Sequence, residues 1–392
     1  MAFAKSPCHF SRMTDNMPNF TFGIEEEYHL VDLQTRDLAA APPGFMDACK
    51  RRLGDRVSPE FLATQIEIGT SICHSFSDAR AQIGQFRSAI GEIAREYGLA
   101  PIAAATHPFA ETAGLPTTDK ERYRVLAKDL AGIGRRMAIC GMHVHVGIED
   151  PECRIDVMNQ IRYFMPHLLV LSTSSPFWKG VDTGLKSYRL AIVDEGPRTG
   201  LPGKIASWDE YQRTIAVLVD GGVIEDASKI WWDLRPSSRF PTLEMRITDV
   251  ATRLDDTIAI AALYVCITRM LTRLRRANLS WRSYPVFLLE ENRWRAQRYG
   301  VKGELFDFGK GTLVPFAGLI EEIGALVAED AVALGCEAHI AHARSIAVTG
   351  TSADRQVETF ERLSANGGGK EEALRAVVDQ LIAETGDVSE RV

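Results

Sequence analysis

The sequence predicts an α+β fold. Two observations lead to this prediction: several segments alternate polar and apolar residues with the period of a β-strand, and amphipathic helical patterns lie between them. The strands and helices do not alternate with the regularity of a parallel sheet, which argues against an α/β fold. With 392 residues, of which 45% are hydrophobic, the chain can bury one large core or two moderate ones.

The first half of the chain contains two expected strands followed by helices. We expect strands at 21–32 and 64–69, and then a helix that Ser77 caps and Gly98 ends. The apolar residues of that helix recur at helical spacing: Ile83, Phe86, Ile90, Ile93 and Tyr97. A further helix is expected at 156–172.

The second half begins with a capping box, in which Ser207 and Glu210 open a helix that ends at Gly221 and Gly222. Strands are expected at 229–235 and 242–250, and an apolar helix near Asp256. A glycine-rich linker at 366–369 precedes a terminal amphipathic helix, whose apolar residues are Leu374, Val377, Val378, Leu381 and Ile382. These signals predict a flexible extension at 1–18, a single domain at 19–365, and a linker with a C-terminal helix at 366–392.

Composition narrows the possible functions. The formal net charge is −7 with interspersed charges, which argues against nucleic acid as a partner. The seven cysteines are scattered and contain no C-x-x-C pair, which favours reduced thiols and a cytoplasmic protein. The N-terminal residues contain no apolar run of signal-peptide length. The longest apolar stretch, 258–267, is too short for a membrane span, so no membrane association is expected.

Four strand-like segments present the same kind of polar face. Successive side chains of a strand point to opposite sides of a sheet. Residues of the four segments that point to one side therefore include carboxylates, imidazoles and a guanidinium: Glu25, Glu27, Glu67, His143, His145, Glu244 and Arg246. Three consecutive glutamates at 25–27 are costly to bury unless a cation is supplied.

These residues predict a divalent-cation site if the four strands belong to one sheet. Any half-exposed strand alternates polar and apolar residues, so each segment alone also fits a solvated scaffold. The occurrence of the pattern in four segments favours the metal site. A ligand set rich in oxygen, with one or two imidazoles, suits Mg²⁺ or Mn²⁺ better than zinc.

The order of these motifs resembles the carboxylate-amine ligase family, also called type 2 glutamate-cysteine ligases, whose catalytic fold is related to glutamine synthetase. The resemblance rests on GIEEE, QIE, GMHVHVG and TLEMR, and it runs from about Phe20 to about Gln356. It includes SSPFWKGVDTGLKSYR (174–189), PRTGLP (197–202) and WWDLRPSSRFPTLEMR (231–246).

The resemblance implies a curved, mainly antiparallel sheet with helices on its outer face and a concave face that binds ATP and Mg²⁺. It assigns metal binding to Glu25, Glu27, Glu67, His143 and Glu244, and a catalytic role to Arg246. His145, Arg235 and Arg239 are expected to bind nucleotide, and Arg189 and Arg198 to bind substrate. Glu60 is either a further ligand or a solvent-exposed residue.

The implied activity is an ATP-dependent ligation that forms a γ-glutamyl-type amide through an acyl phosphate, with L-glutamate and L-cysteine as the default substrates. Three alternatives stay open: a ligase of the same fold for another acid and amine, a metal-dependent hydrolase that uses the same Glu/His cluster, and a noncatalytic metal- or nucleotide-binding protein. Small amino acids are the expected partners, and a homo-oligomer is allowed.

Overall fold

The computed structural model describes residues 17 and 20–389, so nearly all of the predicted extension at 1–18 lies outside the described residues. Its centre is a seven-stranded sheet in the order β2-β3-β1-β5-β9-β8, with β4 also paired to β1. The strands of this sheet are β1 (Phe22–Asp32), β2 (Val57–Pro59), β3 (Gln65–Gly69), β4 (Leu99–Ile102), β5 (Met142–Gly147), β8 (Leu234–Pro236) and β9 (Thr242–Met245). Every pair of neighbouring strands is antiparallel, which confirms the prediction of a mainly antiparallel sheet.

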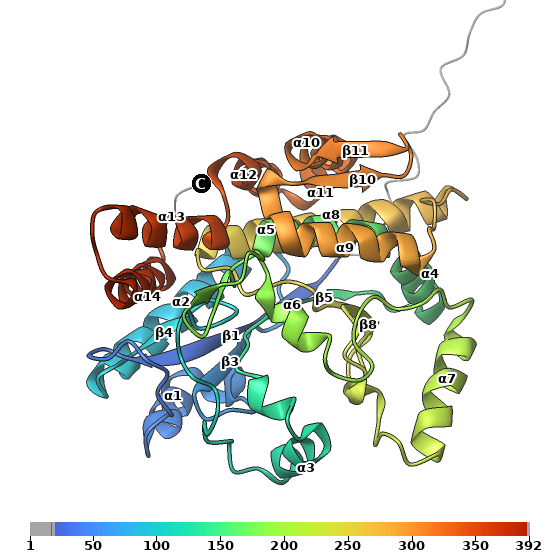
Figure 1. Cartoon of the computed structure of the whole chain (residues 1–392). Helices are drawn as coiled ribbons and strands as arrows, with labels where there is room; N and C mark the ends of the chain where they lie inside the picture. Colours follow the sequence, from blue (N-terminus) through green and yellow to red (C-terminus); the bar gives the residue numbers. More distant parts are fainter. Residues whose placement is uncertain (1–16, 18–19, 390–392) are drawn as a thin grey trace, which may run out of the picture.

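The apolar face of the sheet lies against a layer of helices (Figure 1). Ile24, Ile66, Val144 and Met245 come from four adjacent strands, and all four are fully buried in the main core. Alternation along each strand therefore separates an apolar face, which packs on helices, from the polar face on the other side. This arrangement confirms the predicted fold class.

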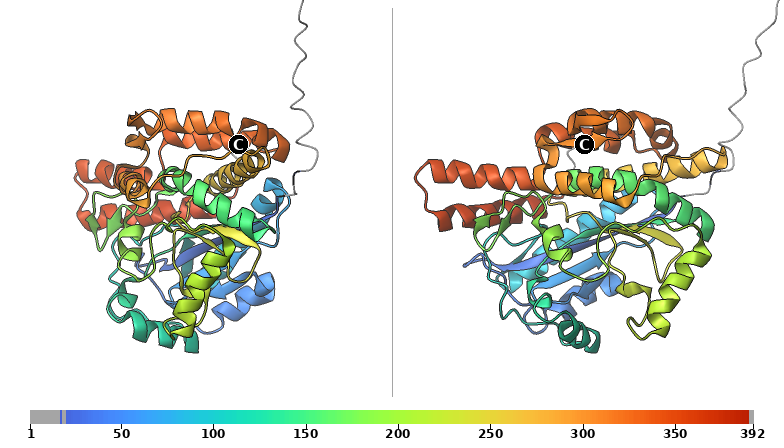
Figure 2. Two further views of the ribbon diagram at one scale, coloured as in Figure 1. Left: turned by 90° about the vertical axis from the view of Figure 1, so that its right-hand side faces the viewer. Right: turned by 45° about the vertical axis from the view of Figure 1, so that its right-hand side comes forward.

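Helices make up most of the remaining chain. The longer ones are α1 (Phe45–Leu53), α2 (Phe76–Glu96), α3 (Glu121–Leu130), α4 (Pro151–Ile161), α5 (Met165–Ser172), α7 (Trp208–Asp220), α8 (Leu254–Arg276), α9 (Val286–Tyr299), α10 (Phe316–Leu326), α12 (Glu337–Thr349), α13 (Ser352–Ala365) and α14 (Lys370–Gly386). Two short helices, α6 (Tyr188–Val193) and α11 (Ala328–Leu334), and two small hairpins, β6–β7 (Phe177–Trp178 and Val181–Asp182) and β10–β11 (Glu304–Asp307 and Thr312–Pro315), complete the set. Both views in Figure 2 show α10 to α12, in orange, as an outer layer beyond α8 and α9.

Helix α8 is the central helix of the core. By length and composition it could cross a membrane, but 89% of its most apolar stretch is buried inside the protein. It packs against α2, α4, α5 and α12, so its apolar surface is covered by the protein itself. The predicted apolar stretch at 258–267 lies within this helix.

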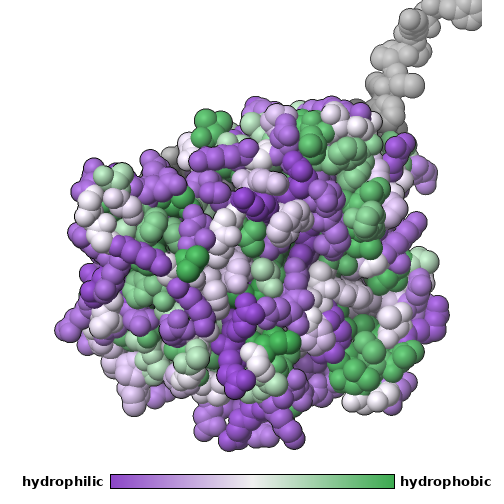
Figure 3. All heavy atoms as spheres, in the orientation of Figure 1, coloured by the Kyte–Doolittle hydropathy of each residue, from purple (hydrophilic) through white to green (hydrophobic). Residues whose placement is uncertain are grey.

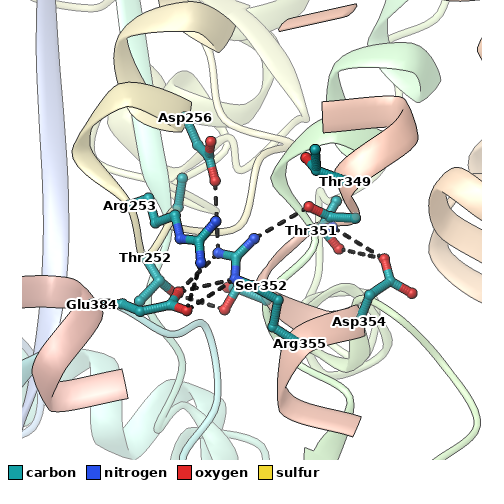
Figure 4. Close-up of polar contacts among 12 residues, drawn as sticks. Thr252, Arg253, Asp256, Thr349, Thr351, Ser352, Asp354, Arg355 and Glu384 are labelled. Carbon is teal, nitrogen blue, oxygen red and sulfur yellow. Dashed lines mark hydrogen bonds and ion pairs between the residues drawn. The ribbon is translucent and has the colours of Figure 1, made fainter. Parts of the chain in front are cut away.

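The C-terminal helix is attached to the body of the protein. Four of its predicted apolar residues, Leu374, Val377, Val378 and Leu381, are buried in a cluster with residues of β4. Figure 4 shows a second attachment, in which Arg253 and Arg355 both contact Glu384 of α14. A cavity of about 380 Å³ opens beside these three residues and includes none of the predicted site residues.

Two helix starts differ from the prediction. The side chain that caps α2 is Ser75, which accepts a hydrogen bond from the backbone N–H of Asp78, and not Ser77. The helix expected at 156–172 starts earlier, at Pro151, because Asp150 caps it and proline suits the first turn. A 3₁₀ turn at 162–164 divides it into α4 and α5. The Ser207 cap of α7 is confirmed.

Both strands predicted between 229 and 250 are shorter than expected. Residues 229–233 are not a strand, because Asp226 caps a 3₁₀ turn at 227–229 and the next residues bond to the loop at 198–200. Strand β9 ends at Met245, since the backbone N–H groups of Arg246 and Ile247 both donate to the carbonyl of Asp233. Two residues then oppose one, as in a β-bulge, and the side chain of Arg246 still pairs with Glu244, two residues before it.

Helix α7 stands apart from the core. Tyr211 is its one buried residue. A hydrophobic patch at the lower right of Figure 3 lies over this helix, where the side chain of Val217 is 71% exposed. Helix α7 is therefore held mainly by its N-terminal half and contributes little to the core.

Candidate functional site

Strand register brings the predicted carboxylates and histidines together on the polar face. On β1, Glu25 lies opposite His143 of β5, and Glu27 lies opposite Glu67 of β3. On the other side of β5, His145 lies opposite Glu244 of β9. The structure therefore places all of the predicted metal-binding residues on four adjacent strands, as the prediction of a shared sheet requires.

The first cluster consists of Glu25, His143 and Glu244, whose potential ligand atoms all lie within 4.8 Å of one another. Nδ1 of His143 lies 3.3 Å from Oε2 of Glu25, and Nε2 of His145 lies 3.5 Å from Oε1 of the same carboxylate. His145 also forms a 3.0 Å hydrogen bond with Thr242 Oγ1. Two carboxylates and an imidazole thus converge at one point.

The charges in the first cluster are tightly linked. Burial by itself would raise the pKa of Glu25, but hydrogen bonds to His143 and His145 hold it well below its ordinary value. Burial lowers the pKa of His143 to about 4, and the charge of Arg246 adds to this effect. At neutral pH His143 is therefore a neutral imidazole, the form that can bind a metal ion.

Glu244 is held between two guanidinium groups. Nε of Arg235 donates to Oε2 of Glu244 at 3.0 Å, and Arg246 forms an ion pair with the other oxygen. Burial opposes ionisation, but Arg246 and Arg235 together keep the pKa of Glu244 well below its ordinary value. The predicted catalytic residue Arg246 therefore lies directly beside the first cluster, and it also lies 3.5 Å from Nδ1 of His143.

The second cluster consists of Glu27, Glu60 and Glu67, whose carboxylate oxygens also lie within 4.8 Å of one another. Burial, followed by the charge of Glu60, raises the pKa of Glu27 to about 7. The same two causes raise the pKa of Glu67 well above its ordinary value. Among the described residues, no lysine or arginine forms an ion pair with any of the three. Three carboxylates thus share a space without a protein cation in contact.

One oxygen of Glu27 is fixed by the backbone. The N–H of Gly141, which directly precedes β5, donates to Oε2 of Glu27 at 2.6 Å. This bond orients the carboxylate while leaving its other oxygen free to face Glu60 and Glu67. For Glu60 the sequence allows either a ligand or a solvent-exposed residue; the structure shows it half-buried, in the same cluster as Glu27 and Glu67.

The remaining predicted arginines differ in their surroundings. Arg189 is 6% exposed, and its guanidinium donates to the backbone carbonyls of Arg246 and Ile247. Arg198 donates to the carbonyl of Lys229 and lies over the ring of Trp231. Arg239 is exposed. Neither Arg198 nor Arg239 contacts the two clusters within the described part of the chain, and their substrate and nucleotide roles stay predictions.

Sequence reasoning missed the partner of Glu26. This glutamate points to the apolar face, where Arg87 of α2 bonds to both of its oxygens, at 3.0 and 2.7 Å. Arg87 lies four residues after Ile83 and three before Ile90, both fully buried, so it sits on the buried side of its helix. A charged residue in the apolar stripe of a helix was the signal that could have revealed it.

Comparison with known proteins shows the family of this chain. The sequence profile of glutamate-cysteine ligase family 2 (GCS2) matches residues 21–380. A Rhodospirillum rubrum protein named "Putative glutamate--cysteine ligase 2" is 58% identical over 373 residues, which cover 94% of this chain and 96% of that protein. A Jannaschia protein of the same name is 54% identical over 364 residues, which cover 93% of this chain and 96% of that one.

The fold has solved counterparts at low sequence identity. The crystal structure of glutamate-cysteine ligase from Francisella tularensis in complex with AMP superimposes with a TM-score of 0.69 at 13% identity, covering 95% of this chain and 90% of that one. A bifunctional glutathione synthetase from Pasteurella multocida has a TM-score of 0.66 at 14% identity, covering 93% of this chain and 52% of that one. By the profile match and by its close relatives, the chain belongs to glutamate-cysteine ligase family 2.

Proposed function

We propose that this protein is an ATP-dependent ligase that joins the γ-carboxylate of L-glutamate to the amino group of L-cysteine. The observation that carries the proposal is the polar face of the sheet, which holds two carboxylate clusters, the first of them paired with Arg246 and Arg235, in a chain of this family. The AMP complex of the Francisella protein, which shares the fold, supports the use of an adenine nucleotide.

The residues present fit divalent cations. Oxygen ligands predominate, as Mg²⁺ and Mn²⁺ prefer, and neutral His143 supplies one nitrogen to the first cluster. The like charges of Glu27, Glu60 and Glu67 are stable together when a cation lies between them. Glu25, His143 and Glu244 would hold one ion, and Glu27, Glu60 and Glu67 another. When bound, Mg²⁺ neutralises phosphate oxygens and orients the nucleotide.

The reaction needs no covalent enzyme intermediate. A carboxylate oxygen of glutamate attacks the γ-phosphorus of ATP, the bond to the β-phosphate oxygen breaks, and ADP leaves. The amine then attacks the acyl phosphate carbon, inorganic phosphate leaves, and the amine loses its proton to solvent. Arg246 stabilises the negative charge that develops on the phosphoryl oxygens, an effect worth about 2.7 to 4 kcal/mol where a single donor has been removed from other enzymes.

Other residues take supporting roles in this proposal. His145, Arg235 and Arg239 bind nucleotide, and Arg189 and Arg198 serve the amino acid substrates. Burial opposes protonation of His145, but its hydrogen bond to Glu25 and the charge of Glu244 raise its pKa, which favours an imidazolium that can face phosphate. A cytoplasmic location and a homo-oligomer belong to the same proposal.

The test is ADP release from Mg²⁺·ATP with glutamate and a panel of amines, each substrate also being omitted in turn. Glutamate with cysteine should give the highest rate, with one γ-glutamylcysteine formed for each ADP. Turnover with a different acid and amine would indicate a ligase of other specificity, and substrate hydrolysis without ATP would indicate a metal-dependent hydrolase. ATP binding without turnover on any pair would contradict the ligase proposal.

The catalytic role of Arg246 has a matched control. Arg246→Ala should lower kcat by about 10²- to 10³-fold, as loss of a transition-state donor does elsewhere. Arg344→Ala removes an exposed arginine that pairs with Glu321 on the outer helices, and it should leave kcat unchanged. Equal activity of the two variants would contradict the role of Arg246.

A further inference from the structure

The backbone that carries Arg246 lies beyond the regular part of the sheet. Strand β9 ends at Met245, and Arg246 lies in the bulge against Asp233, beyond the regular ladder of the sheet. Residues 246–250 continue as irregular backbone next to the start of β5. The direction of the Arg246 side chain therefore depends on whatever fixes this segment.

Arg189 provides one fixed point. Its Nη1 donates to the carbonyl of Ile247 and its Nη2 to the carbonyl of Arg246, each at 3.2 Å. The guanidinium fits there because residue 141 is glycine: a Cβ atom on Gly141 would lie 2.5 Å from Nη2 of Arg189. Arg189 thus holds the bulge by its backbone.

Asp249 provides the second fixed point, on the same segment and three residues after Arg246. It is fully buried, and its Oδ2 accepts hydrogen bonds from the N–H of Ser174 at 3.0 Å and from the hydroxyl of Ser175 at 2.8 Å. Its Oδ1 accepts from the hydroxyl of Ser187 at 2.8 Å. Three donors from two separate parts of the chain therefore converge on one carboxylate.

The two fixed points form a closed ring. The hydroxyl of Ser175, which donates to Asp249, also accepts the backbone N–H of Arg189 at 3.1 Å. The guanidinium of Arg189 returns to the carbonyl of Arg246, on the segment that contains Asp249. A shift of the Asp249 carboxylate would therefore move both the helix start that carries Arg189 and the bulge that carries Arg246.

We propose that Asp249 is a positioning residue for phosphoryl transfer, which holds the backbone of Arg246 so that its guanidinium stays beside Glu244 and the first cluster. This inference rests on the proposed function. It also gives a role to the segment 174–189, whose Ser174, Ser175, Ser187 and Arg189 are all members of the network. A displacement of about 1 Å can cost about 10²-fold in rate, so small movements at Asp249 matter for turnover.

The hydrogen bonds around Asp249 also contribute to stability, so the experiment must distinguish a loss of stability from a loss of positioning. Gln356 of α13 donates to the carbonyl of Ser174 at 2.8 Å, so the network also attaches the C-terminal helices. A suitable control is Asp330, an equally buried aspartate that bonds to Arg269 and Arg273 of α8. Asp330→Asn removes a buried charge from the core without touching the Arg246 segment.

The first experiment compares Asp249→Asn with Asp330→Asn in the full-length protein. Asn keeps the shape of Asp but places an N–H₂ group against donors, so Asp249→Asn should lower kcat by about 10²-fold, as a comparable misplacement does. The KM for ATP and the Mn²⁺·ATP affinity measured by electron paramagnetic resonance should change little. Asp330→Asn should lower the unfolding midpoint and leave kcat unchanged.

A double variant and a milder one complete the test. If Asp249 acts through Arg246, Asp249→Asn should lower kcat little further in an Arg246→Ala background, whereas independent effects would multiply and contradict the proposal. Should Asp249→Asn fail to fold, Ser187→Ala removes one of the three donors and should still lower kcat without changing the KM for ATP. Wild-type kcat in either folded variant overturns the positioning role. Absence of ADP release by the wild type overturns the proposed function instead, and this inference with it.

Discussion

Two adjacent glutamates on β1 show how differently the two faces of the sheet treat a buried charge. Glu26 faces the helices and is fully buried, with Arg87 bonded to both oxygens and Thr257 donating to one of them at 2.6 Å. Glu27 faces the other way, toward Glu60 and Glu67, and no lysine or arginine in the described residues forms an ion pair with it.

This difference between the partners of Glu26 and Glu27 distinguishes a charge that serves stability from one that serves function. On the helix side the chain supplies its own cation, because the core would otherwise contain an unpaired charge. On the polar side, no lysine or arginine of the described residues pairs with Glu27, Glu60 or Glu67, and under the proposed function a divalent cation takes that place. Buried like charges that no side chain of the protein neutralises are typical of functional sites.

The largest expected effect is the loss of stability on removing Arg87, the cation that pairs with Glu26. Arg87→Ala leaves Glu26 buried without a partner and should lower the free energy of unfolding by about 3–5 kcal/mol. Urea unfolding followed by circular dichroism measures this change. Arg124→Ala, which breaks an exposed pair with Glu121, should cost less than about 1 kcal/mol. Similar losses of unfolding free energy in both variants would show that the buried pair of Arg87 with Glu26 matters no more for stability than an exposed pair.

The matching change on the polar face should act on ion binding. Glu67→Gln removes one of three converging carboxylates and should weaken Mg²⁺-dependent ATP binding by at least about 10- to 100-fold, the loss seen when even outer-sphere partners of a metal are removed. Without metal, the variant should be at least as stable as the wild type, because repulsion is relieved. Calorimetric titration and urea unfolding test these outcomes, and a destabilised variant with normal binding would contradict them.

Near the end of β1, a titratable side chain is buried without any charge: His29 is a neutral imidazole. Burial, with a smaller contribution from His107, lowers the pKa of His29 to about 3, and burial lowers that of His107 to about 4. The unfolded chain takes up protons on both below about pH 6.5, while the folded protein does not. Stability from these groups is thus complete above pH 6.5 and falls as the pH drops toward their folded values.

Each of the two histidines should contribute up to about 1.4 kcal/mol of lost stability per pH unit below 6.5. Urea unfolding at pH 7.0 and 5.5 measures the slope, and His107→Gln should reduce it. An unchanged slope in that variant would show that His107 takes up its proton equally in the folded and unfolded states, which would contradict its lowered pKa.

The smallest expected effect concerns the helix that carries Arg87. Ser75→Ala should lower the free energy of unfolding by about 1 kcal/mol, because the hydroxyl of Ser75 caps α2, while Ser77→Ala should change it little. If Ser77→Ala instead lowered the stability more than Ser75→Ala in thermal or urea unfolding, Ser77 would be the cap, as the sequence predicts.

Alternation along the strands was sufficient to predict the polar face. The period of two in GIEEE, QIE and GMHVHVG aims Glu25, Glu27, Glu67 and His143 to one side, and β1 pairs with both neighbours in the register that brings them together. Sequence did not reveal the bond between Arg87 and Glu26, because it joins residues 61 positions apart through packing of a helix on the sheet.

Regular alternation also hid the bulge after β9. It predicted that Arg246 continues the strand, whereas the shared bonds to Asp233 end it. The partners of Asp249 come from 174–187, and nothing in the spacing of those serines shows that they converge on one carboxylate.

Mn²⁺ binding to the wild-type protein, measured by electron paramagnetic resonance with and without ATP, tests the proposed cation site most directly. Two clusters on one face predict saturable Mn²⁺ binding that ATP strengthens, that excess Mg²⁺ displaces, and that Glu67→Gln weakens. Mn²⁺ that stays free at every protein concentration, with and without ATP, would contradict the claim that this face of the sheet is built for a divalent cation.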